Sequence, residues 1–255
     1  MALMPKQLVT IQTEHGVALL TLNRPEARNA MNVDLARATV EALQQLQSER
    51  AIVVTGAGSA FCAGLDLRAL GTTTVTDMPP FVEVFRRSAV PVIAAVNGAA
   101  VTGGLELALA CDFIVASDRA RFADTHLRVG VYPGPVLVDL PRRIGMAKAR
   151  ELSLTGNFIQ ADEALRWGLV NHVVSHDTLV PFTLGLARDI AEVSPAMVQA
   201  MRTDWNQTSA LPLADAHRRH SEFMRVQGTY STAGSSLTQH HRAVIARAHR
   251  KPTES

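Results

Sequence analysis

The chain contains 255 residues, of which 47% are hydrophobic and 19% charged, and its formal net charge at pH 7 is +2. This length suits one large domain, or a domain with a small appendage, that buries a sizeable core. The weak net charge gives no reason to expect nucleic acid or a membrane as a partner. The sequence contains no run of about 18 apolar residues and no signal-peptide pattern, so we expect a cytoplasmic protein.

The cysteines and histidines do not have the spacing of a metal site. Cys62 and Cys111 lie in apolar surroundings, and we expect them to be a reduced pair. The pairs His217/His220 and His240/His241 lie among arginines and are typical of solvated helix faces. We therefore expect no metal.

The N-terminal part predicts a hairpin, a helix and two buried strands. Val9–Gln12 and Val17–Leu22 alternate around a two-residue turn, as the strands of a hairpin do. Apolar residues then recur at helical spacing over Val33–Gln47. The apolar runs Ala51–Thr55 and Val90–Val96 predict short strands.

Helices and strands continue to alternate through the middle of the chain. Leu105–Ala110 is apolar nearly all round, which predicts a buried helix. Phe113–Ser117 and Leu169–Val174 are predicted strands, and Ala147–Leu154 and Ala161–Trp167 are predicted helices between them. Repeated strand–turn–helix units predict an α/β fold.

The C-terminal part lacks strand signals. Helical stretches are expected over Ala196–Thr203, Asp215–Arg225 and Leu237–Arg250, with Gly228–Ser236 as a loop between the last two. We therefore divide the chain into a core of residues 1–194 and a helical region of residues 195–255.

Two glycine-rich turns carry the chemical signal. Ala60–Asp66 (AFCAGLD) and Asn97–Asp112 (NGAAVTGGLELALACD) each follow a predicted strand, and the second turn opens into an apolar helix. Such turns leave backbone N–H groups unpaired, and two of them aimed at one point can hold a carbonyl oxygen that gains negative charge. Glu106 lies on the first turn of the helix, where its carboxylate can overhang that point.

A third turn, Thr55–Ser59 (TGAGS), invites a different interpretation, because glycine-rich turns after strands also bind dinucleotides. The tyrosines oppose this interpretation. Tyr132 and Tyr230 are the only two, and neither has a lysine four residues later, as the dehydrogenases with this opening do.

Several ordered segments resemble the crotonase superfamily, which includes the enoyl-CoA hydratases and isomerases. They are Leu22–Asn32, Ile52–Leu67, Pro91–Asp112, Arg121–Gly134 and Glu163–Val174. The resemblance implies a spiral of ββα repeats with a helical C-terminal region that assembles a homotrimer or hexamer. It also implies an acyl-CoA thioester as substrate and no separate cofactor, because CoA enters as part of the substrate.

The resemblance assigns roles to residues of both turns. The backbone N–H groups of Leu65 and Gly103 are expected to form an oxyanion hole for the thioester oxygen. The dipole of the helix that follows Gly103 should further stabilise the negative charge on this oxygen. Arg24 and Arg28 lie where members of the family approach the CoA moiety, although either arginine is equally well explained as a solvated charge. The remaining expected substrate-binding residues are Ala63, Gly64, Asp66, Leu67 and Gly104.

The expected catalytic groups depart from the hydratase pattern at one position. Glu106 matches one of the two glutamates of enoyl-CoA hydratases, and its apolar neighbours should raise its pKa. His126 stands at the position of the second glutamate. Imidazole titrates near neutrality but cannot grip water as a carboxylate does. Asp124 is a possible substitute, since it would share a face with His126 if the segment is extended.

The sequence therefore predicts an enoyl-CoA hydratase/isomerase-type enzyme that works through an oxyanion-stabilised enolate, with hydration of a 2-enoyl-CoA as the expected reaction. Because His126 replaces a carboxylate, two alternatives remain open. One is a crotonase of another reaction, such as an isomerase with a single carboxylate. The other is an acyl-CoA-binding protein without catalytic activity.

Overall fold

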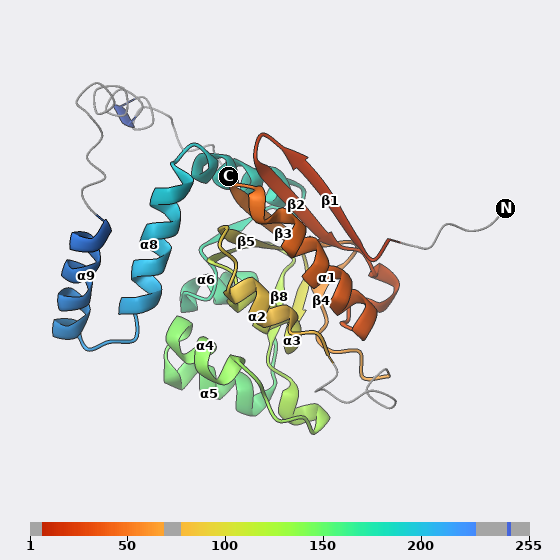
Figure 1. Cartoon of the computed structure of the whole chain (residues 1–255). Helices are drawn as coiled ribbons and strands as arrows, with labels where there is room; N and C mark the ends of the chain where they lie inside the picture. Colours follow the sequence, from red (N-terminus) through yellow and green to blue (C-terminus); the bar gives the residue numbers. More distant parts are fainter. Residues whose placement is uncertain (1–6, 69–77, 228–243, 246–255) are drawn as a thin grey trace. The chain divides into compact units, whose positions relative to one another are not determined.

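The computed structural model describes residues 7–68, 78–227 and 244–245 (Figure 1). The chain divides into two compact units, residues 1–192 and 193–255, and each is described by itself. The predicted loop at 228–236 lies outside the described residues. So does the predicted helix at 237–250, apart from residues 244–245, which are helical.

A six-stranded sheet forms the centre of the first unit. Its strands lie in the order β1 (Val9–Glu14), β2 (Val17–Leu22), β3 (Ala51–Gly56), β5 (Val92–Val96), β7 (Phe113–Ser117) and β10 (His172–Val174). The β1–β2 pair is the predicted hairpin and is antiparallel, and the other neighbours are parallel. Both faces are covered, and β3 and β5 are accordingly buried throughout and almost wholly apolar.

Each face of this sheet contributes to its own apolar cluster, because successive side chains point to opposite faces. Ile52 and Val54 belong to the larger cluster, and Val53 belongs to the smaller one. The smaller cluster includes Leu179 and Ala187 of α7 (Leu179–Ala191), so this helix covers one face of the sheet.

A second, four-stranded sheet contains β4 (Ala60–Cys62), β6 (Ala99–Val101), β8 (Arg121–Ala123) and β9 (Ile159–Gln160) in that order. The pairs β4–β6 and β6–β8 are parallel, whereas β8–β9 is antiparallel. The chain alternates between the sheets: β3, β5 and β7 lie in the large sheet, and β4, β6 and β8 follow them in the small one. A helix follows each of these pairs, which confirms the predicted α/β architecture of ββα repeats.

The helices predicted from periodicity are present, and further ones accompany them. The predicted helices correspond to α1, α3, α5 and α6, whereas α2, α4 and α7 were not predicted. The first part of the predicted strand at 169–174 lies outside β10. The remaining bounds in this unit are η1 (Pro25–Ala27), α1 (Val33–Gln45), η2 (Leu46–Ser48), α2 (Phe81–Arg86), α3 (Gly103–Leu109), η5 (His126–Val129), α4 (Val136–Ile144), α5 (Met146–Thr155), α6 (Ala161–Trp167) and η6 (His176–Thr178).

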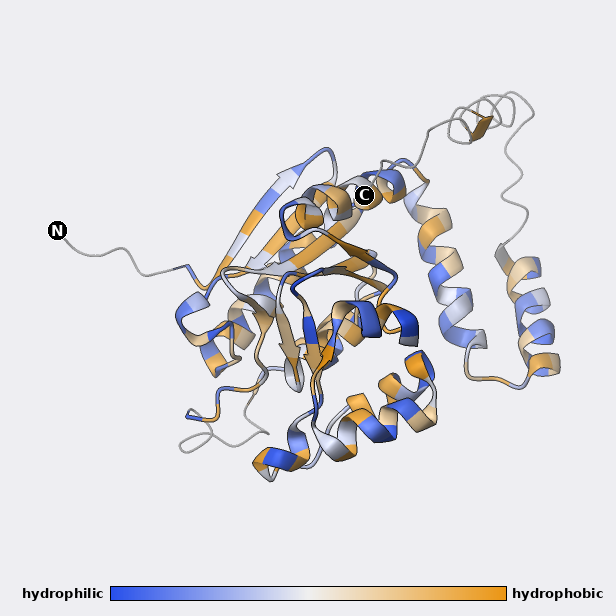
Figure 2. Cartoon of the chain, turned by 180° about the vertical axis from the view of Figure 1, so that it is seen from behind, coloured by the Kyte–Doolittle hydropathy of each residue, from blue (hydrophilic) through white to orange (hydrophobic). Residues whose placement is uncertain are grey.

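Most of the described part of the second unit is a helix pair, α8 (Pro195–Thr208) and α9 (Leu213–Gln227). Hydrophobic and hydrophilic residues alternate along both ribbons in Figure 2. The side chains of His220 and Asp204 join the two helices, with 2.5 Å between Nδ1 and Oδ2. The assembly role expected for this region stays a prediction.

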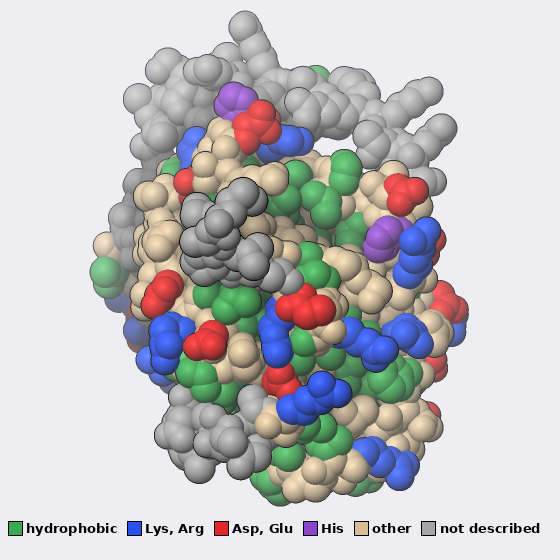
Figure 3. Space-filling model, turned by 90° about the vertical axis from the view of Figure 1, so that its right-hand side faces the viewer, with side chains coloured by type: hydrophobic (Ala, Val, Ile, Leu, Met, Phe, Trp, Pro, Cys, Tyr) green, Lys and Arg blue, Asp and Glu red, His purple; other side chains and the backbone are tan. Residues whose placement is uncertain are grey.

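The mixed charges seen on one face of the molecule (Figure 3) agree with the small net charge of +2. Basic and acidic side chains lie interspersed on the face shown in Figure 3. Among the described residues, no helix combines the length and the hydropathy that a membrane crossing requires.

The glycine-rich turns within Ala60–Asp66 and Asn97–Asp112 approach each other so closely that there is no room for a side chain at position 64. Gly64 has a φ of +92°, and a Cβ added there would lie 1.9 Å from Thr102 Oγ1 and 2.9 Å from the carbonyl oxygen of Val101. Glycine is therefore required at this position both by backbone conformation and by contact.

We predict that Gly64→Ala lowers the free energy of unfolding by about 2–4 kcal/mol, since the strained φ and the overpacking both contribute. Gly130→Ala is the matched control, because Gly130 has a φ of +71° but nothing within 4 Å of an added Cβ. Urea unfolding of both variants measures the difference. Equal losses in the two variants would show that the contact with Thr102 is unimportant.

Candidate active site

Three loops meet at one edge of the small sheet. Parallel strands place their carboxyl ends at the same edge, and β4, β6 and β8 are parallel neighbours. The residues that follow these strands are Ala63–Leu65, Thr102–Gly103 and Asp124–His126. The topology thus brings together the expected oxyanion donors and one expected acid/base pair from segments about 60 residues apart in sequence.

The loop after β4 is fixed so that one N–H group remains available. Met31 donates to the carbonyl of Gly64 and accepts from the N–H of Asp66, at 2.7 and 2.8 Å. These two bonds flank Leu65, so the N–H of Leu65 points to the opposite side of the extended segment. Within the described residues, no backbone hydrogen bond is donated by the Leu65 N–H.

Gly103 lies opposite this N–H, at the start of α3. A Cβ added to Gly103 would lie 3.8 Å from the nitrogen of Leu65, which measures how closely the two turns approach. Because Gly103 is the first residue of the helix, its own N–H has no intrahelical acceptor. The sharp entry into α3 places Thr102 at φ +47° and ψ −113°, a strained conformation for a residue with a side chain.

Glu106 is held inside the protein beside these donors. Glu106 is 7% exposed, and its Oε1 accepts a hydrogen bond of 3.2 Å from the N–H of Val136. Burial raises the pKa of the Glu106 carboxyl, although the N–H groups of Val136 and Gly134 and the charge of His126 partly offset this rise. The pKa rise expected from the apolar neighbours is therefore present, and burial causes it.

Asp124 and His126 form a buried pair. His126 Nδ1 lies 2.6 Å from Asp124 Oδ1, and the two side chains are 7% and 1% exposed. A carboxylate only accepts, so the hydrogen lies on Nδ1 and Nε2 is the ring nitrogen left for a ligand. The segment is not extended, because His126 begins η5. The two side chains meet through a contact between residues i and i+2 rather than across a strand face.

Each member of this pair shifts the pKa of the other. Burial opposes charge on His126, but the hydrogen bond to Asp124 and the negative charges of Glu106 and Asp124 outweigh it and raise the pKa of His126. Burial also raises the pKa of Asp124, yet hydrogen bonds from His126 and Ser153 overcome that effect and lower it. The ion-pair form of Asp124 and His126 is thus favoured.

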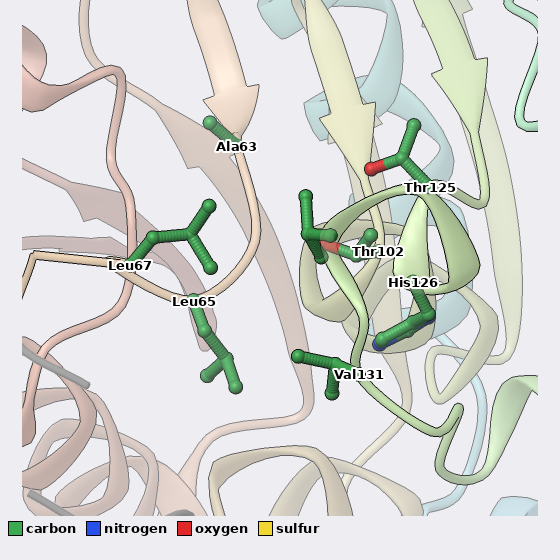
Figure 4. A pocket seen from close by; sticks show the side chains of 8 residues that line it. Ala63, Leu65, Leu67, Thr102, Thr125, His126 and Val131 are labelled. Atoms are coloured by element: carbon green, nitrogen blue, oxygen red, sulfur yellow. The ribbon is translucent and has the colours of Figure 1, made fainter. Parts of the chain in front are cut away.

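A pocket lies between the loop that follows β4 and His126. Its lining comprises Ala63, Leu65, Leu67, Thr102, Thr125, His126, Val129 and Val131. In Figure 4, Leu65 and Leu67 lie on one side and Thr125 and His126 on the other, with the side chain of Val131 reaching across toward Leu65. An apolar wall therefore faces a titratable ring across a narrow space.

The expected substrate-binding residues divide into two groups. Ala63 and Leu67 line the pocket. Gly64 and Gly104 serve close backbone approach instead, since a Cβ at Gly104 would lie 2.0 Å from the carbonyl oxygen of Cys62. This explains two of the glycines by packing.

The two arginines have different surroundings, since Arg24 binds Asp66 whereas Arg28 is exposed. Arg24 Nη1 binds Asp66 Oδ2 at 2.7 Å and the carbonyl of Ala30 at 2.9 Å, so this arginine fixes the loop. Arg28 is exposed, and its carbonyl accepts from the N–H of Ala63 at 3.1 Å. Of the two, Arg28 is the exposed one, and its role at CoA stays a prediction.

Sequence reasoning missed the groups that hold the catalytic candidates. The N–H of Val136 and that of Gly134 act on Glu106, and Ser153 acts on Asp124. Backbone donors leave no mark in a sequence, and Ser153 lies on α5, far from any motif. The described residues contain no cluster of three or more His, Cys, Asp or Glu side chains suited to a metal ion.

Comparison with known proteins identifies the family. The family model for enoyl-CoA hydratase/isomerase matches residues 12–239. The chain is 38% identical over 224 residues to a protein named probable enoyl-CoA hydratase from Rhizobium meliloti, covering 84% of this chain and 87% of that protein. It is also 38% identical over 206 residues to (E)-benzylidenesuccinyl-CoA hydratase from Thauera aromatica, covering 76% and 80%.

The fold comparison agrees with these relatives. The crystal structure of enoyl-CoA hydratase from Mycobacterium smegmatis matches with a TM-score of 0.84 and 30% identity, over 93% of this chain and 97% of the other. The resemblance to the crotonase superfamily is thus confirmed in sequence and in fold. The chain belongs to the enoyl-CoA hydratase/isomerase family of that superfamily.

Proposed function

We propose that this protein hydrates the double bond of a 2-enoyl-CoA thioester. The observation that carries the proposal is the meeting of four groups at the ends of β4, β6 and β8: a buried carboxyl, a buried imidazole and two N–H groups without an acceptor among the described residues. The relatives named as enoyl-CoA hydratases support the same substrate class. No cofactor is required by this chemistry, because the thioester of CoA itself activates the substrate.

The N–H groups of Leu65 and Gly103 bind the thioester oxygen as it becomes an enolate. The dipole of α3 adds to this stabilisation, although the helix is short. Removal of one such donor typically costs about 2.7–4 kcal/mol in the transition state. The backbone donors are therefore expected to contribute a share of the rate enhancement comparable to that of the acid/base groups.

Glu106 and His126 supply the two proton transfers. The Glu106 carboxylate takes a proton from water as the oxygen adds to Cβ, and the His126 imidazolium delivers a proton from Nε2 to Cα. Asp124 and Glu106 raise the pKa of His126, which favours the protonated ring that this step uses. Asp124 is a positioning residue, since it holds Nδ1 and directs Nε2 to the substrate.

A second reaction of the same enolate, isomerisation of a 3-enoyl-CoA, has one specific observation in its favour. Asp124 is engaged by His126, so Glu106 is the carboxyl that remains for the substrate within the described site. One carboxyl can move a proton between Cα and Cγ by itself. Conversion of a 3-enoyl-CoA into a conjugated product distinguishes this reaction from hydration.

We also propose that residues 195–255 assemble the chain into a homotrimer or hexamer. Met197, Met201 and Trp205 support this, because they recur every four residues on one stripe of α8 and are all exposed. We predict that Trp205→Asp shifts the assembly toward monomer in analytical ultracentrifugation. An unchanged mass would contradict a role for this stripe.

The cytoplasmic location expected from the sequence stays a prediction.

We predict that Glu106→Gln lowers crotonyl-CoA hydration by at least about 10²-fold, because a general acid/base contributes about 10²–10⁴. Affinity for a saturated acyl-CoA should stay within a few fold, since the amide keeps the size of the side chain. Loss of the enoyl absorbance measures turnover. Unchanged turnover would reduce Glu106 to a charge at the start of a helix.

We predict that His126→Gln lowers hydration by a similar factor and that the double variant Asp124→Asn/His126→Glu recovers it. The asparagine replaces a carboxylate that would otherwise repel the new glutamate at this buried place. The wild-type rate should fall as pH rises through the pKa of His126, which lies above its ordinary value of about 6.5. This basic limb should be absent from the double variant, and its persistence there would exclude His126 as its source.

A further inference from the structure

The Asp124–His126 pair could support a second reaction besides hydration. General-base attack on an acyl carbonyl requires a carboxylate that holds Nδ1, an imidazole whose Nε2 faces the substrate, and two N–H donors. Asp124 holds Nδ1 of His126, and His126 and Leu65 line one pocket. Gly103 lies beside Leu65, because a Cβ added to Gly103 would be 3.8 Å from the Leu65 nitrogen. In hydration, water adds to Cβ. In acyl hydrolysis, water adds to the carbonyl carbon, whose oxygen already occupies the oxyanion hole.

We propose that the same pocket hydrolyses acyl-CoA thioesters, with water as the nucleophile, His126 as the general base and Asp124 as its positioning residue. The substrate class is an acyl-CoA that lacks a conjugated double bond and so cannot be hydrated. This inference rests on the proposed function for the oxyanion pair and for acyl-CoA binding.

The reaction balances without any further reactant. Nε2 of neutral His126 takes a proton from water while the water oxygen bonds to the carbonyl carbon, and the N–H groups of Leu65 and Gly103 hold the resulting oxyanion. The carbonyl then re-forms and the carbon–sulfur bond breaks. The leaving thiolate takes the proton from Nε2, so the products are a carboxylic acid and CoA thiol.

The surroundings of the pair suit this step. Leu65, Val129 and Val131 line the pocket together with His126, so the ring is reached from the pocket past apolar side chains. Asp124 is almost wholly buried, which strengthens its hydrogen bond to Nδ1. Replacement of a glutamate by an imidazole with a buried carboxylate behind it converts a group that grips water with two oxygens into one that deprotonates water through a single nitrogen.

The two reactions need opposite protonation states of His126, and this gives the proposal a distinctive pH dependence. Hydration uses the imidazolium, whereas hydrolysis uses the neutral ring. Hydrolysis should therefore increase with pH over the range in which hydration decreases. Because Asp124 raises the pKa of His126, the change of Asp124 to asparagine should move both limbs to lower pH.

The experiment uses the full chain with butyryl-CoA, and a thiol-reactive dye reports the released CoA. The protein's own thiols should add little signal, because Cys62 and Cys111 are buried and burial raises the pKa of Cys62 to about 12. The variants are His126→Gln, Asp124→Asn and the control Asp162→Asn, which removes an exposed carboxylate on α6. Crotonyl-CoA hydration is measured on the same preparations.

We expect thiol release by the wild type, a loss of at least about 10²-fold in His126→Gln and of about tenfold or more in Asp124→Asn, and no change in the control. The pH limb of hydrolysis should lie lower in Asp124→Asn, which a purely structural role for Asp124 would not produce. Thiol release no faster than without enzyme would overturn the proposal, as would full activity in His126→Gln or an unmoved limb.

The hydration assay separates this inference from the proposed function. Hydration without thiol release overturns hydrolysis alone. Thiol release without hydration or isomerisation supports hydrolysis and overturns the hydratase proposal. Loss of both reactions, with acyl-CoA binding retained, overturns both and leaves a binding protein.

Discussion

The parallel pairing of β4, β6 and β8 is the constraint on which the rest of the site depends. Each strand is three residues long, yet the ladder fixes where its carboxyl end lies relative to the others. The loop after β4 brings the N–H of Leu65, the loop after β6 brings that of Gly103, and the loop after β8 brings Asp124 and His126. A shift of one residue in any pair would turn alternate groups away from the pocket.

This convergence is obtained at a local cost in stability. Thr102 adopts a positive φ, and Gly64 and Gly104 pack against backbone or side-chain atoms with no space for a Cβ. Three titratable side chains, Glu106, Asp124 and His126, are buried within the same region. The surrounding apolar core must offset these strains, and the bonds of Met31 to Gly64 and Asp66 hold the first turn in place. The site is therefore preorganised by the fold rather than by the substrate.

The sequence predicted the large features and missed the small ones for identifiable reasons. The hairpin, α1 and α6 carry enough residues for a periodic pattern, and their ranges were found within a few positions. Strands of three residues, such as β4 and β6, are too short to show a period, so only the glycines after them were visible. Arg24, for which the sequence left a CoA contact and a solvated charge open, binds Asp66, a pairing of residues 42 positions apart that no local pattern predicts. The contact of Asp124 with His126 depends on a 3₁₀ turn, not on the extended segment considered from the sequence.

The resemblance to the hydratases implies a second carboxylate where this chain has His126, backed by Asp124, and this difference changes which groups of the site can hold a proton. Two carboxyls in a buried site share a proton because both cannot be charged at once, whereas a carboxyl and an imidazole attract when both are ionised. Glu106 and His126 influence each other in this way, since each charge favours ionisation of the other. Addition or loss of one proton then shifts His126 between donor and base. In the proposed mechanism, His126 therefore links the direction of proton transfer to pH.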